Sequence, residues 1–391
     1  AFHAVENYRQ ILNADGFKEL LESEHWDIVP GGKYYVTRNN TSILAFKVGT
    51  KLDNYSFNIV TSHTDSPTFK VKENAEIEVK NKYTQLNTEG YGGMLCATWL
   101  DRPLSIAGRV LVSEGNSIVT KLLNIDRDLL MIPNVAIHMN RAANDGFKYN
   151  LQVDMLPLLS AGDDRQKDFK QIIADELGVK KEDILGHDLY LYNRMAPSIW
   201  GANEEFISAG HLDDLQCGFA SLKALLAGYN DESIDIMACF DNEEVGSGTK
   251  QGADSTLLRD TLTRINNALG KTEEDYHRAL ASSFMLSSDN AHAVHPNYPE
   301  HTDATNCTYM NEGVVVKSHA GQKYTSDGVS MAVVKALASG ADVPLQYFAN
   351  RSDKAGGSTL GNIAMAQASM NAVDIGLPQL AMHSSYETAG I

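Results

Sequence analysis

The sequence predicts an α/β fold in which helices cover both faces of a mainly parallel sheet and a β-rich segment interrupts the chain. Short apolar runs alternate with helical patterns near the N-terminus and again from about residue 205 onward, which is typical of a mainly parallel sheet. Between these parts, from about residue 75, apolar and polar residues alternate as in half-buried strands. The 391 residues are 43% apolar and 21% charged, a globular composition with room for two domains.

The N-terminal part is predicted to contain one helix followed by three strands. A helical pattern covers residues 5–22. Residues 34–48 are expected to form two short strands, because an Asn-Asn-Thr turn separates two β-like runs. A third strand is expected over residues 55–62, directly before the segment SHTDSP.

The middle of the chain is predicted to be an inserted β-rich domain. The runs AEIEVKNKYTQLNT, SIAGRVLVSEGNSIVTKLLNI and NVAIHMN alternate like β-strands, and one charged helix is expected over residues 164–177. We therefore divide the chain into a discontinuous α/β domain, residues 1–74 and 205–391, and an inserted domain, residues 75–204.

The C-terminal part is predicted to alternate helices with short buried strands. A helix over residues 214–229 precedes the apolar strand SIDIMACF, residues 233–240. Further strands are expected at SFMLS, LQYFA and LPQLAM, and a helix over residues 358–373 precedes the last of them.

Charge and composition exclude several classes of function. The net charge of -17, from 33 basic and 50 acidic residues, argues against binding to nucleic acid or to an anionic membrane surface. The sequence contains neither an apolar run of about 18 residues nor a signal-like N-terminus, so a cytoplasmic protein without a membrane segment is expected. The four cysteines are scattered without metal-binding spacing and are expected to be reduced core residues.

Candidate polar residues follow the predicted strands or begin a predicted helix. Ligands of open α/β sheets bind outside the carboxyl ends of the strands, so these segments are expected to meet at one edge. The residues concerned are His63 and Asp65, Asp213 and Asp214, Glu243 and Glu244, Asp289, and His383.

A cluster of carboxylates at one edge indicates a bound cation. Like charges held close together repel and raise their pKa values unless a positive charge lies among them. Histidine nitrogen with carboxylate oxygen, and no thiolate, suits zinc, cobalt or manganese in a catalytic site. Two ions sharing one carboxylate would use about five protein ligands and leave a position for water.

Simpler interpretations exist for single residues. Asp214 is expected to cap the helix that follows it, and two adjacent glutamates are usually surface charge. The run NRSDKAGGSTLG lacks the P-loop pattern; it is either a turn with an N-cap, or a helix N-terminus in which Gly357 approaches an anion or a polarised carbonyl. The sequence contains no G-x-S-x-G elbow for a serine nucleophile.

Seven motifs together resemble the M18 family of metallo-aminopeptidases, typified by aspartyl aminopeptidase. They are SHTDSP, LDDL, DNEEVGSG, SSDNAHAVHPNY, KSHAGQKYTSD, NRSDKAGGSTLG and LAMHSSYE, and the likeness runs from about residue 54 onward. The resemblance implies a zinc-peptidase α/β domain, with a mixed sheet sandwiched by helices, interrupted by a β-rich dimerisation domain. It also implies a further segment after Ile391, and it leads us to expect arginine where His211 stands.

The resemblance implies a ligand set for two divalent ions, most simply zinc, with cobalt and manganese as alternatives. His63 and Asp289 would hold one ion, and Glu244 and His383 the other. Asp213 would be shared by both.

Further roles are implied by the same resemblance. Glu243 would be the general base that takes a proton from the metal-bridging water, and Asp65 would hydrogen-bond to His63. Lys317 would receive the side chain of an acidic N-terminal residue, its simpler interpretation being an exposed lysine at a strand end. His138, in the predicted strand NVAIHMN, would reach the site of a neighbouring subunit; a strand histidine at a polar surface is the alternative.

We therefore expect a cytoplasmic aminopeptidase that releases Asp or Glu from the N-terminus of peptides. The resemblance implies a tetrahedral homododecamer, built from dimers, that encloses its active sites. Another metal-dependent amide hydrolase, such as a deacylase, and a non-enzymatic oligomeric scaffold are the alternatives. Asp241 has no predicted chemical role beyond supporting the turn after its strand, and the sequence leaves the native metal and the acidic preference undecided.

Overall fold

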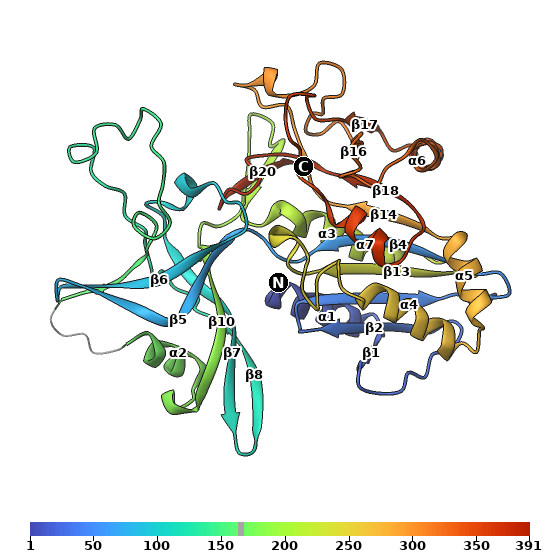
Figure 1. Cartoon of the computed structure of the whole chain (residues 1–391), viewed down its shortest axis with the longest axis horizontal. Coiled ribbons are helices and arrows are strands. Elements are labelled where there is room, and N and C mark those ends of the chain that lie inside the picture. The colour runs from blue at the N-terminus through green and yellow to red at the C-terminus, as the bar shows by residue number, and fades with distance from the viewer. Residues whose placement is uncertain (163–167) are drawn as a thin grey trace.

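The computed structural model describes residues 1–162 and 168–391, which form two regions side by side (Figure 1). The larger region is built on a nine-stranded mixed sheet. In spatial order its strands are β1 (Lys18–Leu20), β2 (Lys33–Arg38), β3 (Ser42–Val48), β13 (Ser233–Phe240), β4 (Ser56–His63), β14 (Phe284–Ser288), β18 (Asn371–Gly376), β16 (Val314–Lys317) and β17 (Leu345–Phe348).

The centre of this sheet is parallel and its flanks are mixed. Strands β13, β4, β14 and β18 pair in parallel with one another. Strand β3 is antiparallel to β13, and β16 is antiparallel to β18. The mixed sheet and its helical cover confirm the predicted fold class.

Helices cover both faces of the sheet, because its central strands carry apolar residues on both faces. On β13, Met237 and Cys239 belong to the core beneath one set of helices, whereas Ile236 and Phe240 belong to the core beneath the other. The first set contains α1 (Phe2–Ala14), α3 (Leu212–Ala227) and α6 (Gly328–Gly340); the second contains α4 (Leu257–Ala268), α5 (Glu273–Ala281) and α7 (Leu360–Gln367).

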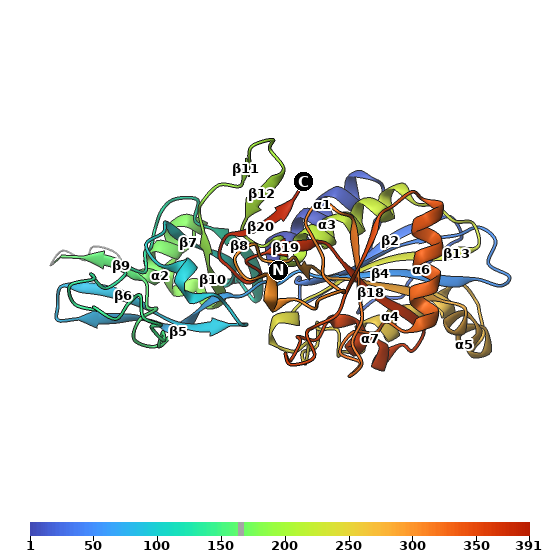
Figure 2. The ribbon, with the colours of Figure 1, turned by 90° about the horizontal axis from the view of Figure 1, so that it is seen from above.

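The smaller region is a six-stranded antiparallel sheet with one helix, α2 (Phe169–Leu177), on its core. It projects to one side of the helix-covered sheet (Figure 2). Its strands, in spatial order, are β8 (Ser117–Asn124), β7 (Leu104–Glu114), β10 (Ile184–Asn193), β5 (Thr68–Val79), β6 (Tyr83–Tyr91) and β9 (Leu158–Ala161).

A third sheet, of five strands, lies where the two regions meet. Its order is β11 (Ser198–Trp200), β12 (Phe206–Ala209), β20 (Glu387–Gly390), β19 (Pro378–Leu380) and β15 (Ala291–His292). Strand β5 runs across the predicted boundary at residue 74, and the β11–β12 hairpin runs across that at residue 204. The division into two domains stays a prediction.

Three predicted elements differ from the structure. The first helix ends at Ala14 rather than at residue 22, because Gly16 adopts a φ of +83° and turns the chain toward β1. The last predicted helix ends at Gln367, and the apolar residues after it form the central strand β18. Residues 134–140, which contain His138, form a loop with a turn rather than the predicted strand.

Other predicted elements are close to the structure. The strand at residues 233–240 is β13, and the two strands around the Asn-Asn-Thr turn are β2 and β3. Helix α2 begins at Phe169, where Asp168 accepts a hydrogen bond from the Gln171 N–H; residues 164–167 of the predicted helix lie outside the described residues. Within residues 1–162 and 168–391, no helix has both the length and the apolar character needed to cross a membrane.

Candidate metal centre

The carboxyl ends of three neighbouring strands, β13, β4 and β14, meet at one edge of the nine-stranded sheet (Figures 1 and 2). His63 is the last residue of β4, and Asp289 directly follows β14. Glu244 lies in the short 3-10 helix Glu243–Val245, just after β13. Because parallel neighbours end on the same side, three separate segments deliver side chains to one place.

Two further segments add Asp213, at the start of α3, and His383, in the loop between β19 and β20. The two oxygens of Asp213 face different histidines: Oδ1 is 3.5 Å from His63 Nε2, and Oδ2 is 3.4 Å from His383 Nε2. Glu244 Oε2 is 3.2 Å from His383 Nε2, and Asp289 Oδ1 is 3.9 Å from His63 Nε2. These five side chains, which we call the ligand cluster, therefore have Asp213 at their centre.

Asp214 lies beside the ligand cluster and does not cap α3. The backbone of Asp213 and Asp214 is not helical, so the regular turns of α3 follow Asp214. The Asp214 carboxylate nevertheless turns toward β4: Oδ2 accepts a hydrogen bond of 3.1 Å from the His63 N–H, and Oδ1 has no hydrogen-bond partner among the described residues. The N-cap prediction for this residue is therefore wrong. Potential ligand atoms of His63, Asp214 and Asp289 lie within 4.8 Å of one another, so Asp214 adds a carboxylate to the same place.

Asp65 connects His63, the Glu243–Val245 turn and Tyr91 beside the ligand cluster. Its Oδ1 accepts a hydrogen bond from the Glu243 N–H, and its Oδ2 accepts one from the Glu244 N–H, at 3.1 and 3.2 Å. The phenol of Tyr91 donates a further bond of 2.6 Å to Oδ2. The His63 Nδ1 atom lies 3.1 Å from the Asp65 carbonyl oxygen and 3.5 Å from Oδ1, which directs Nε2 toward the ligand cluster.

Glu387, like Asp65, accepts hydrogen bonds from backbone N–H groups of the site, and it was not predicted from the sequence. Its Oε2 accepts a 2.9 Å hydrogen bond from the Asp213 N–H, and its Oε1 accepts one of 2.7 Å from the His383 N–H. The signal was present in the motif LAMHSSYE, where a lone glutamate follows the histidine by four positions. Nothing in that spacing, however, reveals a bond to a residue as distant along the chain as Asp213.

The loop that follows β6 reaches from the six-stranded sheet to the ligand cluster. The Gly93 carbonyl lies 2.7 Å from His383 Nδ1, which leaves Nε2 facing Asp213 and Glu244, and the Leu95 N–H donates to the His383 carbonyl at 3.0 Å. A Cβ at Gly92, whose φ is +74°, would lie 3.1 Å from the Glu244 Cβ. Glycine is therefore needed at Gly92 both for its conformation and for its closeness to a ligand.

The charges of the centre perturb one another strongly. Burial, together with neighbouring carboxylates, raises the pKa of Glu243 to about 7. Burial alone would lower the pKa of His383, but the adjacent Asp213 carboxylate and the charge of Glu244 raise it to about 9. Burial would likewise lower the pKa of His63, but the nearby carboxylates of Asp213 and Asp65 raise it instead. The centre thus holds more negative charge than its two histidines neutralise.

Orphaned oxygens test whether these residues fit a metal ion. Among the described residues, Asp213 Oδ1, Asp214 Oδ1 and Glu244 Oε1 are buried without a hydrogen-bond partner. Leaving such groups unpaired is costly, and a divalent cation would satisfy them. Imidazole nitrogens and carboxylate oxygens are also donors that zinc, cobalt and manganese accept. The residues present therefore fit divalent metal ions.

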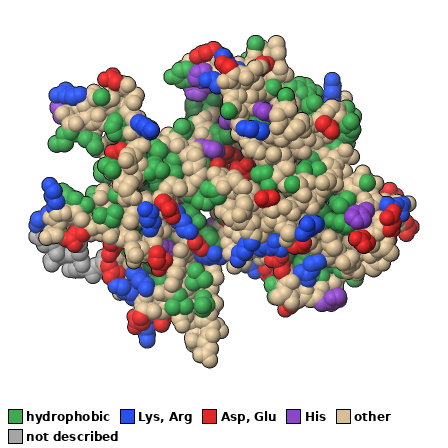
Figure 3. All heavy atoms as spheres, in the orientation of Figure 1, with side chains coloured by type: hydrophobic (Ala, Val, Ile, Leu, Met, Phe, Trp, Pro, Cys, Tyr) green, Lys and Arg blue, Asp and Glu red, His purple; other side chains and the backbone are tan. Residues whose placement is uncertain are grey.

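The Glu243 carboxylate is the one acidic group of the Glu pair that stays uncommitted. Its neighbour Glu244 turns into the ligand cluster, whereas no hydrogen bond or ion pair occupies the Glu243 side chain in the part of the chain that the structure describes. In the space-filling view, acidic and histidine side chains gather in a central hollow of the surface (Figure 3). Chemically, this arrangement combines a cation site with a free carboxylate that can accept a proton.

Lys317 lies inside the protein, 3% exposed, rather than on the surface at a strand end. Its Nζ donates a hydrogen bond of 2.9 Å to the Asn290 carbonyl and lies 3.7 Å from Asp289 Oδ2. Nearby carboxylates, Asp289 first among them, raise its pKa although burial would lower it. A permanent positive charge therefore stands directly beside one member of the ligand cluster.

His138 and Gly357 are not brought into the ligand cluster. Both are exposed, His138 in the loop over residues 134–140 and Gly357 in the segment before α7. Within the described residues, no hydrogen bond or ion pair joins either of them to the five clustered side chains. A Cβ added at Gly357 would meet no atom within 4 Å.

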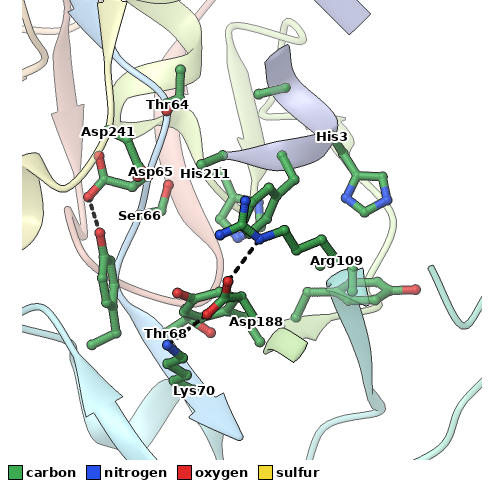
Figure 4. A pocket seen from close by; sticks show the side chains of 18 of the residues that line it. His3, Thr64, Asp65, Ser66, Thr68, Lys70, Arg109, Asp188, His211 and Asp241 are labelled. Atoms are coloured by element: carbon green, nitrogen blue, oxygen red, sulfur yellow. Dashed lines mark hydrogen bonds and ion pairs between the residues drawn. The ribbon is translucent and has the colours of Figure 1, made fainter. Parts of the chain in front are cut away.

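A cavity of about 720 Å³ adjoins Asp65 between the two regions (Figure 4). Across it, Asp188 accepts hydrogen bonds from Lys70 at 3.0 Å and from Arg109 at 2.8 Å. His211 is part of the lining, but none of the five clustered side chains is, as far as the described residues go. The cavity is therefore separate from the candidate metal centre.

Comparison with known families shows one match along the whole chain. A family model described as Aminopeptidase I zinc metalloprotease (M18) matches residues 1–391. A probable M18 family aminopeptidase 2 of Clostridium novyi is 48% identical over 397 residues, which cover 100% of this chain and 92% of the relative. A protein of the same description from Stutzerimonas stutzeri is 40% identical over 395 residues, or 100% of this chain and 91% of the relative.

Solved structures give the same picture of the fold. A chain in a cryo-EM structure of the Ape4 and Nbr1 complex superposes with a TM-score of 0.96 at 35% identity, covering 100% of this chain and 79% of that one. A structure of the S. cerevisiae mApe1 dodecamer superposes with a TM-score of 0.86 at 28% identity, covering 100% of this chain and 89% of that one.

Proposed function

The chain belongs to the Aminopeptidase I zinc metalloprotease (M18) family and is thus a metallo-exopeptidase; from this premise, we propose that it is a two-ion aminopeptidase that prefers acidic N-terminal residues. One observation carries the two-ion part of the proposal. Asp213 presents one oxygen to each of two histidines, at 3.5 and 3.4 Å. A carboxylate placed in this way can be shared by two cations.

We propose that His63, Asp289 and Asp213 hold one divalent ion, and that Glu244, His383 and Asp213 hold the other, with zinc as the resident metal. Bound there, the ions would polarise the scissile carbonyl and lower the pKa of water. The orphaned oxygens of Asp213 and Glu244 support this assignment. Asp65 holds His63 in the orientation that presents Nε2 to an ion.

Glu243 is the proposed general base. Its carboxylate is unoccupied, and burial among other acids raises its pKa to about 7, which suits a group that accepts and returns a proton near neutral pH. It takes the proton of the attacking water and passes it to the leaving amine. Asp65 fixes the backbone of the Glu243–Val245 turn, so that Glu243 and Glu244 keep separate tasks.

Recognition of the substrate is proposed to involve Lys317, Gly357 and His138. Lys317 would give up its contact with Asp289 to receive the carboxylate of an N-terminal Asp or Glu. Gly357 would bring backbone groups close to the bound peptide, since the space around it is open. His138 would act in the site of a neighbouring subunit of a homododecamer; a dodecamer is the assembly described for S. cerevisiae mApe1.

Wider features of the proposal follow from the family and from the fold. The protein would be cytoplasmic, with a tetrahedral arrangement of dimers enclosing its active sites, and the inserted region of residues 75–204 would make the dimer contact. Its substrates would be short or unfolded peptides. Mass measurement of the native particle by light scattering tests the assembly directly: a monomer or an isolated dimer would contradict it.

A substrate panel tests the proposed reaction. Asp, Glu and Leu aminoacyl substrates, each with a free or an acetylated amine, would be assayed with zinc, cobalt or manganese after removal of bound metal by a chelator. We expect hydrolysis of free Asp and Glu substrates only, and no activity without metal. Equal hydrolysis of acetylated substrates would instead indicate a deacylase, and faster cleavage of Leu would remove the acidic preference.

A further inference from the structure

We infer that Glu387 is a positioning residue of the metal centre, which sets the backbone of the shared carboxylate and of one histidine ligand together. The inference rests on the two-ion site proposed above. Glu387 begins β20 and is 2% exposed. It does not itself reach the ions in this assignment, because both of its oxygens are engaged by backbone N–H groups.

The two oxygens of Glu387 are divided between two segments that are far apart in the sequence. Oε2 accepts the hydrogen bond from the Asp213 N–H at the start of α3, and Oε1 accepts that from the His383 N–H at 2.7 Å. Gln379 Nε2 lies 3.4 Å from the same Oε1 atom. One rigid carboxylate therefore fixes the separation of Asp213 and His383, whose side chains are 3.4 Å apart.

The loop carrying His383 needs such an anchor, because its backbone is strained. Ala381 and His383 have φ values of +54° and +67°, a region that residues other than glycine adopt at a cost. The His383 N–H bond to Glu387 and the ring bond to the Gly93 carbonyl hold this conformation from two sides. Without the first bond, the loop is expected to relax and the ring to leave its place.

Strand pairing makes the anchor itself rigid. Glu387 pairs with Ala209 of β12, and β20 also pairs with β19, so the carboxylate lies on the central strand of the five-stranded sheet. Asp65 performs the matching task for the Glu243–Val245 turn. Two buried carboxylates thus position the centre. Glu387 is the one that holds the backbone of Asp213 and His383.

Glu387→Gln tests the inference with little change in shape. The amide keeps one acceptor but turns the other into a donor, which then opposes a backbone N–H. Titration of metal-free protein with Co²⁺, followed by visible absorption, reports the affinity and the geometry of each ion. We expect the ion at Glu244 and His383 to bind about 10–100-fold more weakly with an altered spectrum. The ion at His63 and Asp289 should weaken less, because it shares Asp213 but not His383.

Hydrogen–deuterium exchange of the metal-free protein gives a second readout that does not depend on activity. Peptides covering residues 211–216 and 381–387 should exchange faster in Glu387→Gln, and peptides from β13 should not. Asp188→Asn is the matched control, because it also converts a hydrogen-bonded carboxylate to an amide but touches no proposed ligand. It should leave both the Co²⁺ spectrum and these peptides unchanged.

The possible results distinguish failure of the role inferred for Glu387 from failure of the proposed two-ion site. A folded Glu387→Gln protein that binds both Co²⁺ ions as the wild type does, with unchanged exchange at both segments, overturns the role of Glu387. If Glu387→Gln does not fold, Glu387→Asp keeps the charge but cannot span both N–H groups, and the same two measurements decide. If the wild type takes up only one Co²⁺ ion, the two-ion proposal fails, whereas the variant's effect on that ion still decides the inference.

Discussion

The two regions of the molecule contribute to the metal centre with different chemical groups. None of the five members of the ligand cluster comes from the six-stranded region. Four of them lie at strand ends of the nine-stranded sheet, in the turn after β13 or at the start of α3, and His383 lies in the β19–β20 loop of the five-stranded sheet. The six-stranded region contributes a phenol, a carbonyl and an N–H, from Tyr91, Gly93 and Leu95, which orient groups already present. Changes in the region of the nine-stranded sheet should therefore abolish chemistry, whereas changes in the six-stranded region should loosen geometry.

The sharpest test of this contrast is Glu243→Gln in the region of the nine-stranded sheet. Loss of the proposed general base should lower kcat by about 10²–10⁴-fold, while the amide leaves the ligand cluster intact. Metal content measured on the same sample should equal that of the wild type. Unchanged hydrolysis would falsify the assigned role of Glu243.

Tyr91→Phe tests the orienting role of the six-stranded region. It removes the 2.6 Å hydrogen bond to Asp65 and the bond from the Asn242 side chain, but retains the ring. We expect about 10-fold weaker metal binding, at the lower end of the range for residues that orient ligands, with kcat largely restored at high metal concentration. Loss of activity that excess metal does not restore would show that Tyr91 takes part in the reaction. The six-stranded region would then do more than orient groups of the site.

Asp188→Asn tests how the six-stranded sheet is stabilised at the boundary of the two regions. Burial alone would raise the pKa of Asp188, but hydrogen bonds and charge from Lys70 and Arg109 lower it. A depressed folded-state pKa contributes stability that is complete above the unfolded value of about 3.9 and is lost as the pH falls through the folded value. The variant should be about 1–3 kcal/mol less stable than the wild type at pH 7.

Thermal unfolding of the metal-free proteins from pH 7 to pH 2 checks this sign. The gap in Tm between wild type and Asp188→Asn should narrow only below about pH 4. A gap that stays constant with pH would show that the carboxylate contributes by shape rather than by charge.

Gly357→Ala should have the smallest effect on stability. The glycine is exposed and an added Cβ would have open space, so the free energy of unfolding should change by less than about 0.5 kcal/mol. If Gly357 contacts the peptide, KM should rise while stability stays constant. Unchanged KM for a series of substrates would remove this residue from the proposed binding site.

The same contrast explains what could be predicted from the sequence. Residues His63, Glu244 and Asp289 follow apolar runs that are recognisable as buried strands, so their meeting at one edge follows from the geometry of parallel sheets. Glu387 and Gly93 act on or through backbone groups, which carry no residue-specific signal. Their partners are fixed only by tertiary packing across distant segments.

Errors in the predicted elements have local physical causes. Residues 134–140 have an alternating pattern, but they lie exposed and without strand partners in the described part of the chain. The predicted end of the last helix included Ala372 and Val373, which instead fill both faces of a central strand. The apolar pattern therefore predicted the central strands that end at the site better than it predicted elements whose structure depends on partners far away in the sequence.

The order of the residues along the chain bears on when the candidate metal centre can form. His63 and Asp65 are synthesised early, whereas His383 and the Glu387 that holds it come after the helices and strands from α1 to β19. Until residue 387 has been added, a growing chain lacks the second histidine, and Asp213 lacks its anchor. A two-ion centre of the proposed kind would therefore form only after those earlier elements have been made.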